Sequence, residues 1–145
     1  MIVPDVNLLI YAYDTASTHH SAAASWLEGV MKGGEEIGLA AVVVFGFVRI
    51  STSARVFKNP LTVAEASARV ESWLARPHVR IIEPSPYHVH DVLALLADTG
   101  TAANLTTDAQ VAALALQEKA VIHSNDTDFQ RFPGVRCHNP LLPQA

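Results

Sequence analysis

Short apolar segments alternate with amphipathic helical segments along the whole chain, and this alternation constrains the fold more than any other feature. The segment 37–44 is apolar without interruption and rich in β-branched residues, as in a strand that is covered on both faces. The sequence does not decide where this strand ends, because residues 44–50 also fit the start of a helix. The alternation predicts an α/β fold with a central parallel sheet and helices on both faces. The expected strands are the residues before Asp5 and the segments 37–44, 79–82, 120–123 and 135–137.

The helical segments carry apolar residues at three- and four-residue spacing and have recognisable first residues. Thr62 with Glu65, and Thr107 with Gln110, form capping-box patterns, and Pro86 fits the first turn of a helix. The helix directly after Asp5 is apolar on every side and is therefore expected to be buried. The remaining helix is expected to begin after residues 18–21 and to stop at Gly33 and Gly34.

Length and composition indicate one folded domain over residues 1–145. Half of the residues are hydrophobic, 17% are charged, and no linker-like segment divides the chain. The longest apolar stretch, residues 37–48, is shorter than the roughly 20 residues that span a bilayer, so no membrane association is expected. The start of the sequence does not resemble a secretory signal, and Cys137 is the single cysteine, so a reducing cytoplasm is the expected location. The net charge of −4 argues against binding of nucleic acid through a broad, positively charged surface.

Three aspartates occupy equivalent places in this pattern. Asp5 ends the first strand, Asp108 opens a buried helix, and Asp126 follows the strand 120–123. In a parallel sheet these places point to the same side, where functional groups collect beyond the carboxyl ends of the strands. Gathered carboxylates repel one another, so such a cluster needs a proton or a cation. Mg²⁺ and Mn²⁺ suit it because hard cations prefer oxygen ligands, and such a site can support hydrolysis of a phosphate ester.

Each aspartate also has a purely structural interpretation. Asp108 could complement the dipole of its helix, which contributes about 0.3 to 1 kcal/mol. Asp126 and Asp128 could be turn formers. Asp5 lies in an otherwise apolar segment, where an unpaired charge costs several kcal/mol, so a helix cap is its one inexpensive structural explanation.

Three segments, taken in order, resemble the PIN domain, and specifically the VapC toxins of bacterial toxin–antitoxin pairs. They are Asp-Val-Asn-Leu-Leu at 5–9, Asp108-Ala109 with the apolar helix that follows, and Ser-Asn-Asp-Thr-Asp-Phe at 124–129. The spacing of 18 residues from Asp108 to Asp126 and the length of the chain also match. Residues 20–26 and 47–52 look like the corresponding VapC segments, so the resemblance covers nearly the whole chain.

The resemblance implies a three-layer α/β/α domain and a Mg²⁺- or Mn²⁺-dependent ribonuclease that cleaves structured RNA. It also implies a VapB-type antitoxin as partner and a homodimer. By matching positions, Asp5, Asp108 and Asp126 would be the catalytic and metal-binding residues. Asn7 and Ser124 would orient these carboxylates by hydrogen bonds, with Asp128 beside the site. Arg49 would lie next to the acids, where it could contact a phosphate or form an ordinary salt bridge.

The chain departs from the family pattern at Gly46, where the family usually has a glutamate before a Phe-Val-Arg segment. No glutamate nearby replaces it, so weaker metal binding is expected and a second metal ion is in question. A catalytically weakened PIN domain that binds antitoxin and RNA is therefore the alternative function. A receiver-like signalling domain would need an acidic pair after the first strand and a late lysine, and residues 5–7 and 123–124 supply neither. The seven histidines show no metal-ligand spacing.

Overall fold

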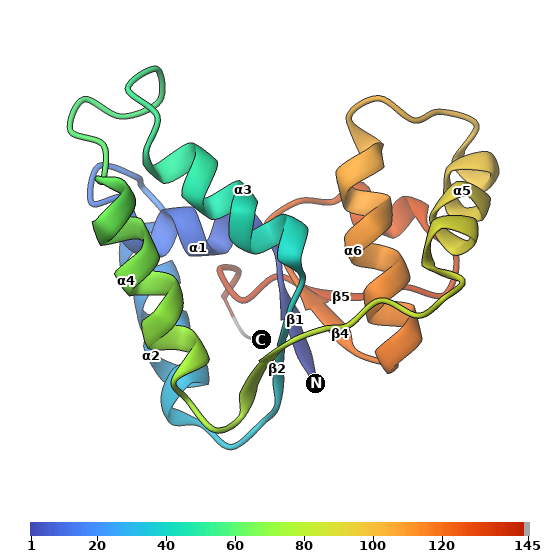
Figure 1. Cartoon of the computed structure of the whole chain (residues 1–145), viewed down its shortest axis with the longest axis horizontal. Coiled ribbons are helices and arrows are strands. Elements are labelled where there is room, and N and C mark those ends of the chain that lie inside the picture. Colours follow the sequence, from blue (N-terminus) through green and yellow to red (C-terminus); the bar gives the residue numbers. More distant parts are fainter. Residues whose placement is uncertain (144–145) are drawn as a thin grey trace.

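The computed structural model describes residues 1–143 and contains one five-stranded sheet in the order β3-β2-β1-β4-β5 (Figure 1). All four strand pairings are parallel, and β1 lies at the centre, where Ile2 pairs with Ile37 on one side and with Val121 on the other. The parallel sheet expected from the sequence is confirmed. The strands are β1 (Ile2–Pro4), β2 (Ile37–Leu39), β3 (Val79–Ile81), β4 (Val121–His123) and β5 (Arg136–His138).

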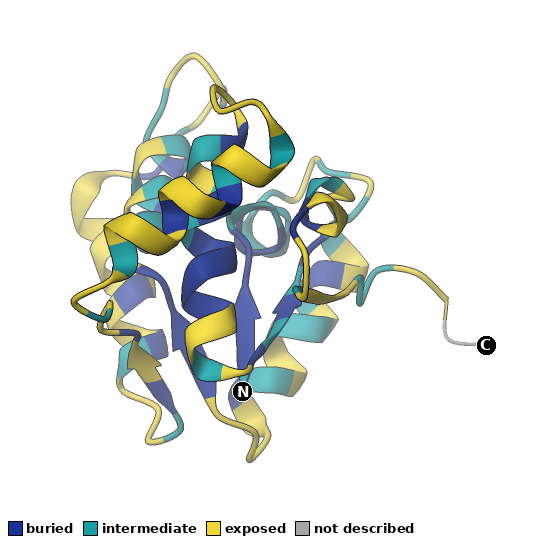
Figure 2. Cartoon of the chain, turned by 90° about the vertical axis from the view of Figure 1, so that its right-hand side faces the viewer, coloured by how far each residue is buried: buried dark blue, intermediate teal, exposed yellow. Residues whose placement is uncertain are grey.

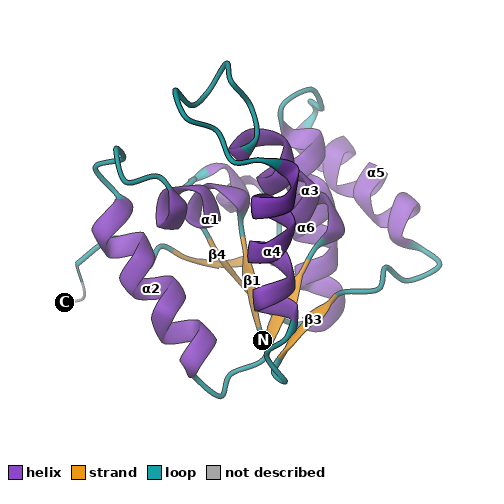
Figure 3. Ribbon diagram, turned by 60° about the vertical axis from the view of Figure 1, so that its left-hand side comes forward, coloured by secondary structure: helices purple, strands orange, loops and turns teal. Residues whose placement is uncertain are grey.

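Helices cover both faces of the sheet, which confirms the three-layer expectation. Connections between parallel strands are almost always right-handed. The chain moves outward from β1 to β3, so α1 to α4 lie on one face, and it then returns to β4 and β5, so α5 and α6 lie on the other (Figures 1 and 3). The helices are α1 (Val6–Tyr13), α2 (His20–Lys32), α3 (Ala41–Ser51), α4 (Val63–Leu74), α5 (His88–Thr99), α6 (Leu105–Glu118) and the short 3-10 helix η1 (Asp128–Arg131).

The core lies between the strands and the inner faces of α1, α3, α4 and α6, while the outer faces of the helices are exposed (Figure 2). In α6 the residues from Val111 to Ala115 are all buried, and three of these five residues are alanines, which allow the helix to approach its neighbours closely. Close approach also explains Gly38 in β2. A Cβ atom there would lie 2.6 Å from Met1 Sδ and 2.7 Å from two side-chain atoms of Ile82.

The strand expected over residues 37–44 is shorter than the sequence indicated. β2 ends at Leu39, and α3 begins at Ala41. Three consecutive valines favour a strand by local preference, but tertiary packing overrides that preference here. Val43, Val44 and Phe47 are buried on the inner side of α3, where the helix packs against α1 and α6, so its apolar character reflects helix packing.

Two helix starts were also placed wrongly by sequence patterns. α5 begins at His88, because Ser85 and Pro86 form a turn in which the backbone carbonyl of Ser85 accepts a hydrogen bond from the His88 amide at 3.0 Å. α6 begins at Leu105, and no side chain caps it, so the Thr107–Gln110 capping box is wrong. The Thr62–Glu65 capping box is confirmed, with both reciprocal hydrogen bonds at 3.1 Å. Within residues 1–143, none of the helices is long and apolar enough to cross a membrane.

Candidate active site

The candidate site lies where the strand order changes direction, between β1 and β4. The helices after β1 cover one face of the sheet and the helix before β4 covers the other, and at such a switch point a crevice forms beyond the carboxyl ends of the strands. A pocket lined by Asp5 and Thr107 lies there. Asp5 follows β1 directly, and Ser124 follows β4 directly. The N-terminus of α6, with Asp108 in its first turn, faces the same crevice.

Asp5 is the N-cap of α1 and is buried, with 6% of its surface exposed. One carboxylate oxygen accepts a hydrogen bond from the backbone amide of Val6 at 2.8 Å. The other accepts a hydrogen bond from the Ser124 hydroxyl at 2.7 Å. The structural interpretation of Asp5 as a helix cap is therefore correct, and it does not exclude a second role, since the carboxylate also borders a pocket.

Ser124 and Asn7 connect Asp5 to the segment that carries Asp126. The Ser124 hydroxyl accepts hydrogen bonds from the Asn7 side-chain amide at 3.3 Å and from the Asp126 backbone amide at 2.9 Å. The side-chain oxygen of Asn7 accepts a longer bond from the Asn125 amide, at 3.5 Å. The two polar side chains therefore hold the loop after β4 against the first turn of α1, and Ser124 contacts Asp5 directly.

Asp108, Asp126 and Asp128 form the tightest group of acids among the described residues. One carboxylate oxygen from each lies within 4.8 Å of the others. Asp126 also accepts a hydrogen bond from the Asp128 backbone amide at 2.9 Å, so its turn-forming role is present as well. Asp128, which the sequence predicts beside the site, lies within the cluster next to Asp126. Asp5 stands next to this group, close enough to influence it electrostatically.

The electrostatics of the cluster are unfavourable to full ionisation. Burial and the nearby charges of Asp5, Asp126 and Asp128 raise the pKa of Asp108 to about 7. Burial also raises the pKa of Asp5, with a smaller contribution from the charge of Asp126, while the hydrogen bonds from Ser124 and Val6 act in the opposite direction. Asp108 therefore holds a proton at neutral pH in a substantial fraction of molecules unless a cation neutralises the cluster.

A pocket of about 330 Å³ opens beside Asp5 and is walled on one side by α3. Gly46 and Arg49 line it from α3, and Thr107 lines it from α6. Arg49 is exposed, lines the pocket beside Asp5 and forms no ion pair among the described residues. A Cβ atom on Gly46 would touch Val6 Cγ2 at an ordinary 3.5 Å, so the backbone has room for a side chain to begin at the position where the family usually carries glutamate. The sequence predicted Thr107 as a helix cap and not as a site residue, and its place next to Asp108 is the one signal for its part in the pocket lining.

The histidines do not gather into a metal site among the described residues. His123 is half-buried, and its Nδ1 accepts a hydrogen bond from the Trp26 indole at 3.0 Å. Burial and the neighbouring His138 lower the pKa of His123 to about 4, so it is neutral at physiological pH. Trp26 therefore acts as a packing and hydrogen-bonding residue between α2 and the sheet.

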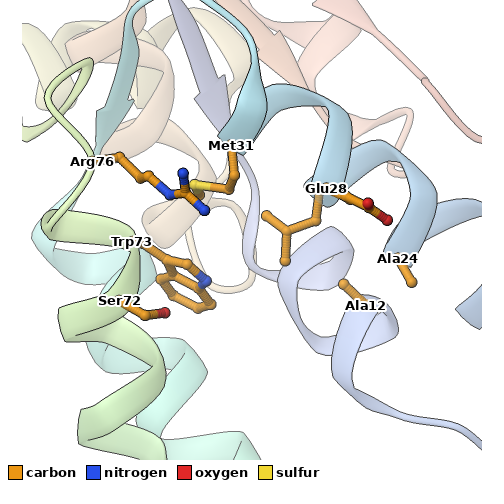
Figure 4. A pocket seen from close by; sticks show the side chains of 8 residues that line it. Ala12, Ala24, Glu28, Met31, Ser72, Trp73 and Arg76 are labelled. Atoms are coloured by element: carbon orange, nitrogen blue, oxygen red, sulfur yellow. The ribbon is translucent and has the colours of Figure 1, made fainter.

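A separate pocket of about 280 Å³ lies away from the acids, between α1, α2 and α4. Figure 4 shows Trp73 and Arg76 on one side of it, Met31 and Ala24 on the other, and Ala12 at its base. Its lining is mostly apolar, with no aspartate, so it is unrelated to the carboxylate cluster.

Comparison with known proteins agrees with this geometry. The family model for the PIN domain matches residues 2–135. Ribonuclease VapC33 of Mycobacterium tuberculosis is 45% identical over 141 residues, covering 97% of this chain and 99% of the relative. The crystal structure of VapBC2 from Rickettsia felis, bound to a promoter DNA fragment, is similar with a TM-score of 0.68 and 21% identity, covering 96% of this chain and 98% of that one.

A second solved structure shares the fold at lower sequence identity. It is VapC20 of Mycobacterium tuberculosis, described as a toxin that cleaves the sarcin–ricin loop, with a TM-score of 0.69 and 14% identity over 94% of this chain and 99% of that one. The family model and the long, 45% identical relative decide the assignment. The chain belongs to the PIN domain family and, within it, to the VapC ribonucleases of toxin–antitoxin pairs.

Proposed function

We propose that this chain is a Mg²⁺- or Mn²⁺-dependent endoribonuclease that acts as the toxin of a type II toxin–antitoxin pair. The observation that carries the proposal is the cluster of Asp108, Asp126 and Asp128, with oxygens within 4.8 Å of one another, beside the buried Asp5. Chain segments far apart in sequence contribute these acids to one crevice. Such a concentration of charge is unfavourable unless it serves to hold a cation.

The donor set fits a hard divalent cation. Carboxylate oxygens are the ligands that Mg²⁺ and Mn²⁺ prefer, and Mg²⁺ commonly uses one or two of them beside several waters. Burial and, after it, repulsion from Asp5, Asp126 and Asp128 raise the pKa of Asp108, and a cation would relieve the repulsion. We assign Asp108, Asp126 and Asp128 as the residues that would hold the ion, with Asp5 as the neighbouring catalytic acid. When bound, such an ion activates water and stabilises charge that develops on a phosphate.

The chain's own residues supply positioning around this centre. Ser124 and Asn7 fix Asp5 so that its carboxylate faces the pocket next to α3. Arg49, exposed on the opposite wall of that pocket, would contact a substrate phosphate. Gly46 leaves open space on that wall, so this part of the pocket would hold water or substrate where a glutamate is usual.

We propose an RNA with a folded loop as the substrate and a VapB-type protein as the partner. Sequence-specific proteins mostly read RNA at loops and bulges, where bases are unpaired. The similarity to VapC20, described as cleaving the sarcin–ricin loop, supports this substrate class. The VapBC complexes from Rickettsia felis and Haemophilus influenzae support the partner. An antitoxin and an RNA target of this kind would place the protein in the cytoplasm.

A homodimer completes the proposal. Three apolar residues of α4, Ala66, Val70 and Trp73, are buried within this domain and are not free to form a dimer surface, although Val63 at the start of the helix is exposed. Tyr87, Val89 and Leu93 at the other end of the molecule are at least 60% exposed on and next to α5. Covering these side chains in a second copy would remove apolar surface from water. Sedimentation equilibrium of the native chain and of Leu93→Glu tests this, and an unchanged monomer mass for both would refute the dimer.

Cleavage of a panel of stem-loop RNAs by the purified protein, with Mg²⁺ or Mn²⁺, tests the nuclease proposal. We expect cleavage that stops with EDTA and in Asp5→Asn, and that persists in the control Asp98→Asn, an exposed acid on α5. A silent native chain beside an active Gly46→Glu would instead show a PIN domain that has lost efficient cleavage. Activity that survives EDTA or Asp5→Asn would refute the proposed site.

A further inference from the structure

Charges are distributed unevenly on the two sides of the candidate active site. Residues 37–64, which include α3 and the loop after it, contain Arg49, Arg55 and Lys58 and no acid. Residues 81–130, on the other side, contain seven acids and a single lysine. The net charge of −4 therefore conceals a basic segment along α3 and its loop, which would attract a polyanion, while Asp14 and Glu65 border its far end.

A pocket of about 340 Å³ lies at the far end of this basic segment, where α1 ends. Its lining includes Tyr13, Phe57, Lys58, Asn59 and Arg69. The two aromatic rings are half-buried and meet edge to face with centroids 5.7 Å apart. The Arg69 guanidinium lies over the Tyr13 ring, 5.0 Å from its centroid. The pocket thus combines flat stacking surfaces with exposed cations.

The basic side chains of this pocket form no ion pairs with the described residues. Among residues 1–143, the ion pairs involve the amino terminus, Lys32 and Arg80, so neither Lys58 nor Arg69 is held in an ion pair. Glu65, one turn before Arg69 on α4, interacts with it electrostatically without forming such a pair. Asp14 is the acid in the pocket lining, and one of its oxygens accepts a hydrogen bond from the Ala16 amide at 3.0 Å within the following turn. The exposed groups available to a ligand are therefore mainly basic, aromatic and amide groups.

We propose that this pocket binds one unpaired nucleotide of the RNA substrate, away from the cleaved bond. Lys58 and Arg69 contact its phosphate, and its base stacks on Phe57 or on the guanidinium plane of Arg69, two modes by which proteins bind unpaired bases. The inference rests on the proposed function, because it assumes that RNA occupies the acidic crevice. It adds a second anchoring point for the same strand.

The spacing between the two sites is suitable for one strand. α1 joins them, from Asp5 at its N-cap to Tyr13 at its last residue. At about 1.5 Å per residue the helix spans about 12 Å. A stacked strand advances about 3.4 Å per nucleotide, so three or four nucleotides cover this distance. Arg49 and Arg55 lie on α3 and in its loop, along the same direction, and could accompany the backbone between the two sites.

The pocket of Figure 4 differs in its lining from the proposed nucleotide pocket, and it supplies a control variant. It carries Arg76 just beyond the same helix α4, but Met31, Leu27 and two alanines dominate it and Glu28 lies at its rim. Such a lining suits apolar protein side chains better than a phosphate. Arg76→Ala therefore removes the same charge as Arg69→Ala, from a nearby place, without touching the proposed nucleotide pocket.

Fluorescence anisotropy with a labelled single-stranded RNA, in EDTA so that no cleavage occurs, tests the proposal. For Lys58→Ala and Arg69→Ala we expect weaker binding, with the slope of log K against log salt reduced by about 0.7 for each lost phosphate contact. Phe57→Leu keeps an apolar side chain and removes the stacking ring, so binding should weaken at least about fivefold with the salt slope unchanged. Circular dichroism confirms that each variant is folded, and Arg69→Lys separates loss of charge from loss of the planar group.

The proposal would be overturned if the native chain did not bind the RNA, or if the pocket variants bound RNA as Arg76→Ala does. It would also be overturned if the pocket variants bound RNA normally and weakened only the binding of a protein partner. Cleavage measured in parallel separates this proposal from the nuclease proposal. Binding that depends on Lys58 and Arg69 in a chain that never cleaves would support the pocket and refute the nuclease. Cleavage with an unchanged KM in all three variants would refute the pocket and leave the nuclease standing.

Discussion

Replacing Asp108 by asparagine should stabilise the metal-free protein at neutral and alkaline pH. Asparagine has almost the same shape as aspartate but carries no charge, so it removes the repulsion from Asp5, Asp126 and Asp128 that contributes to the raised pKa. Most substitutions at partly buried positions destabilise a protein. An increase in the free energy of unfolding is therefore a specific consequence of the crowded carboxylates.

The size of the effect follows from the pKa of Asp108. Its rise from 3.8 to about 7 is roughly three units, and at about 1.36 kcal/mol per unit this gives an upper limit of about 4 kcal/mol. Asp108 is only half-buried, so solvent screening reduces this limit, and we expect about 1 to 2 kcal/mol.

The sign of the pH dependence is fixed by the same shift. Below pH 3.8 the carboxyl group is neutral in both states, and wild type and Asp108→Asn should differ little through this group. As the pH rises from 3.8 to about 7, the unfolded chain loses the proton while the folded protein keeps it, so the wild type loses stability. The advantage of the variant should therefore grow over this window and level off above pH 7.

Urea unfolding followed by circular dichroism, in EDTA and at a series of pH values, measures this difference. Asp98→Asn, with the same chemical change at an exposed position of α5, is the matched control. Added Mg²⁺ should reverse the order, because an ion at 100 times its Kd stabilises the protein that binds it by about 2.7 kcal/mol. A variant that is no more stable than the wild type at pH 8 in EDTA would refute the reasoning about charge crowding.

Three further substitutions test other parts of the site and the fold. Ser124→Ala removes the hydrogen bond to buried Asp5, so we expect a loss of about 1.5 to 3 kcal/mol in urea unfolding at pH 7, and a loss below 0.5 kcal/mol would contradict it. Thr62→Ala removes the capping box of α4 and should cost about 1 kcal/mol by the same measurement, with Ser67→Ala on the exposed face of that helix as control. Gly46→Glu should increase the amount of Mg²⁺ bound in calorimetric titration, whereas Gly46→Gln should not.

The sequence predicted the sheet and the place of the site better than the limits of individual elements. Asp5, Asp108 and Asp126 could be placed at strand ends and a helix start because strand alternation and sheet polarity are long-range rules that tolerate small errors. The start of α3 could not be found, because Val42, Val43 and Val44 favour a strand locally and become helical through packing against α1 and α6. The turn at Asp126 and Asp128 was predictable from their residue types, but the approach of Asp128 to Asp108 was not, because it depends on how the loop after β4 packs against the start of α6.

The missing glutamate affects the two parts of the site differently. Gly46 shares a pocket with Asp5 and Arg49, while the tight oxygen group belongs to Asp108, Asp126 and Asp128. An ion held by those three acids does not need a carboxylate at residue 46, so one ion should bind to the native chain. A second ion would have to lie between Asp5 and α3, where both Asp5 oxygens already accept hydrogen bonds and α3 offers Arg49 as its charge. We therefore expect one Mg²⁺ in the native protein, and a glutamate at position 46 should create the second site if the pocket beside Asp5 is where that ion belongs.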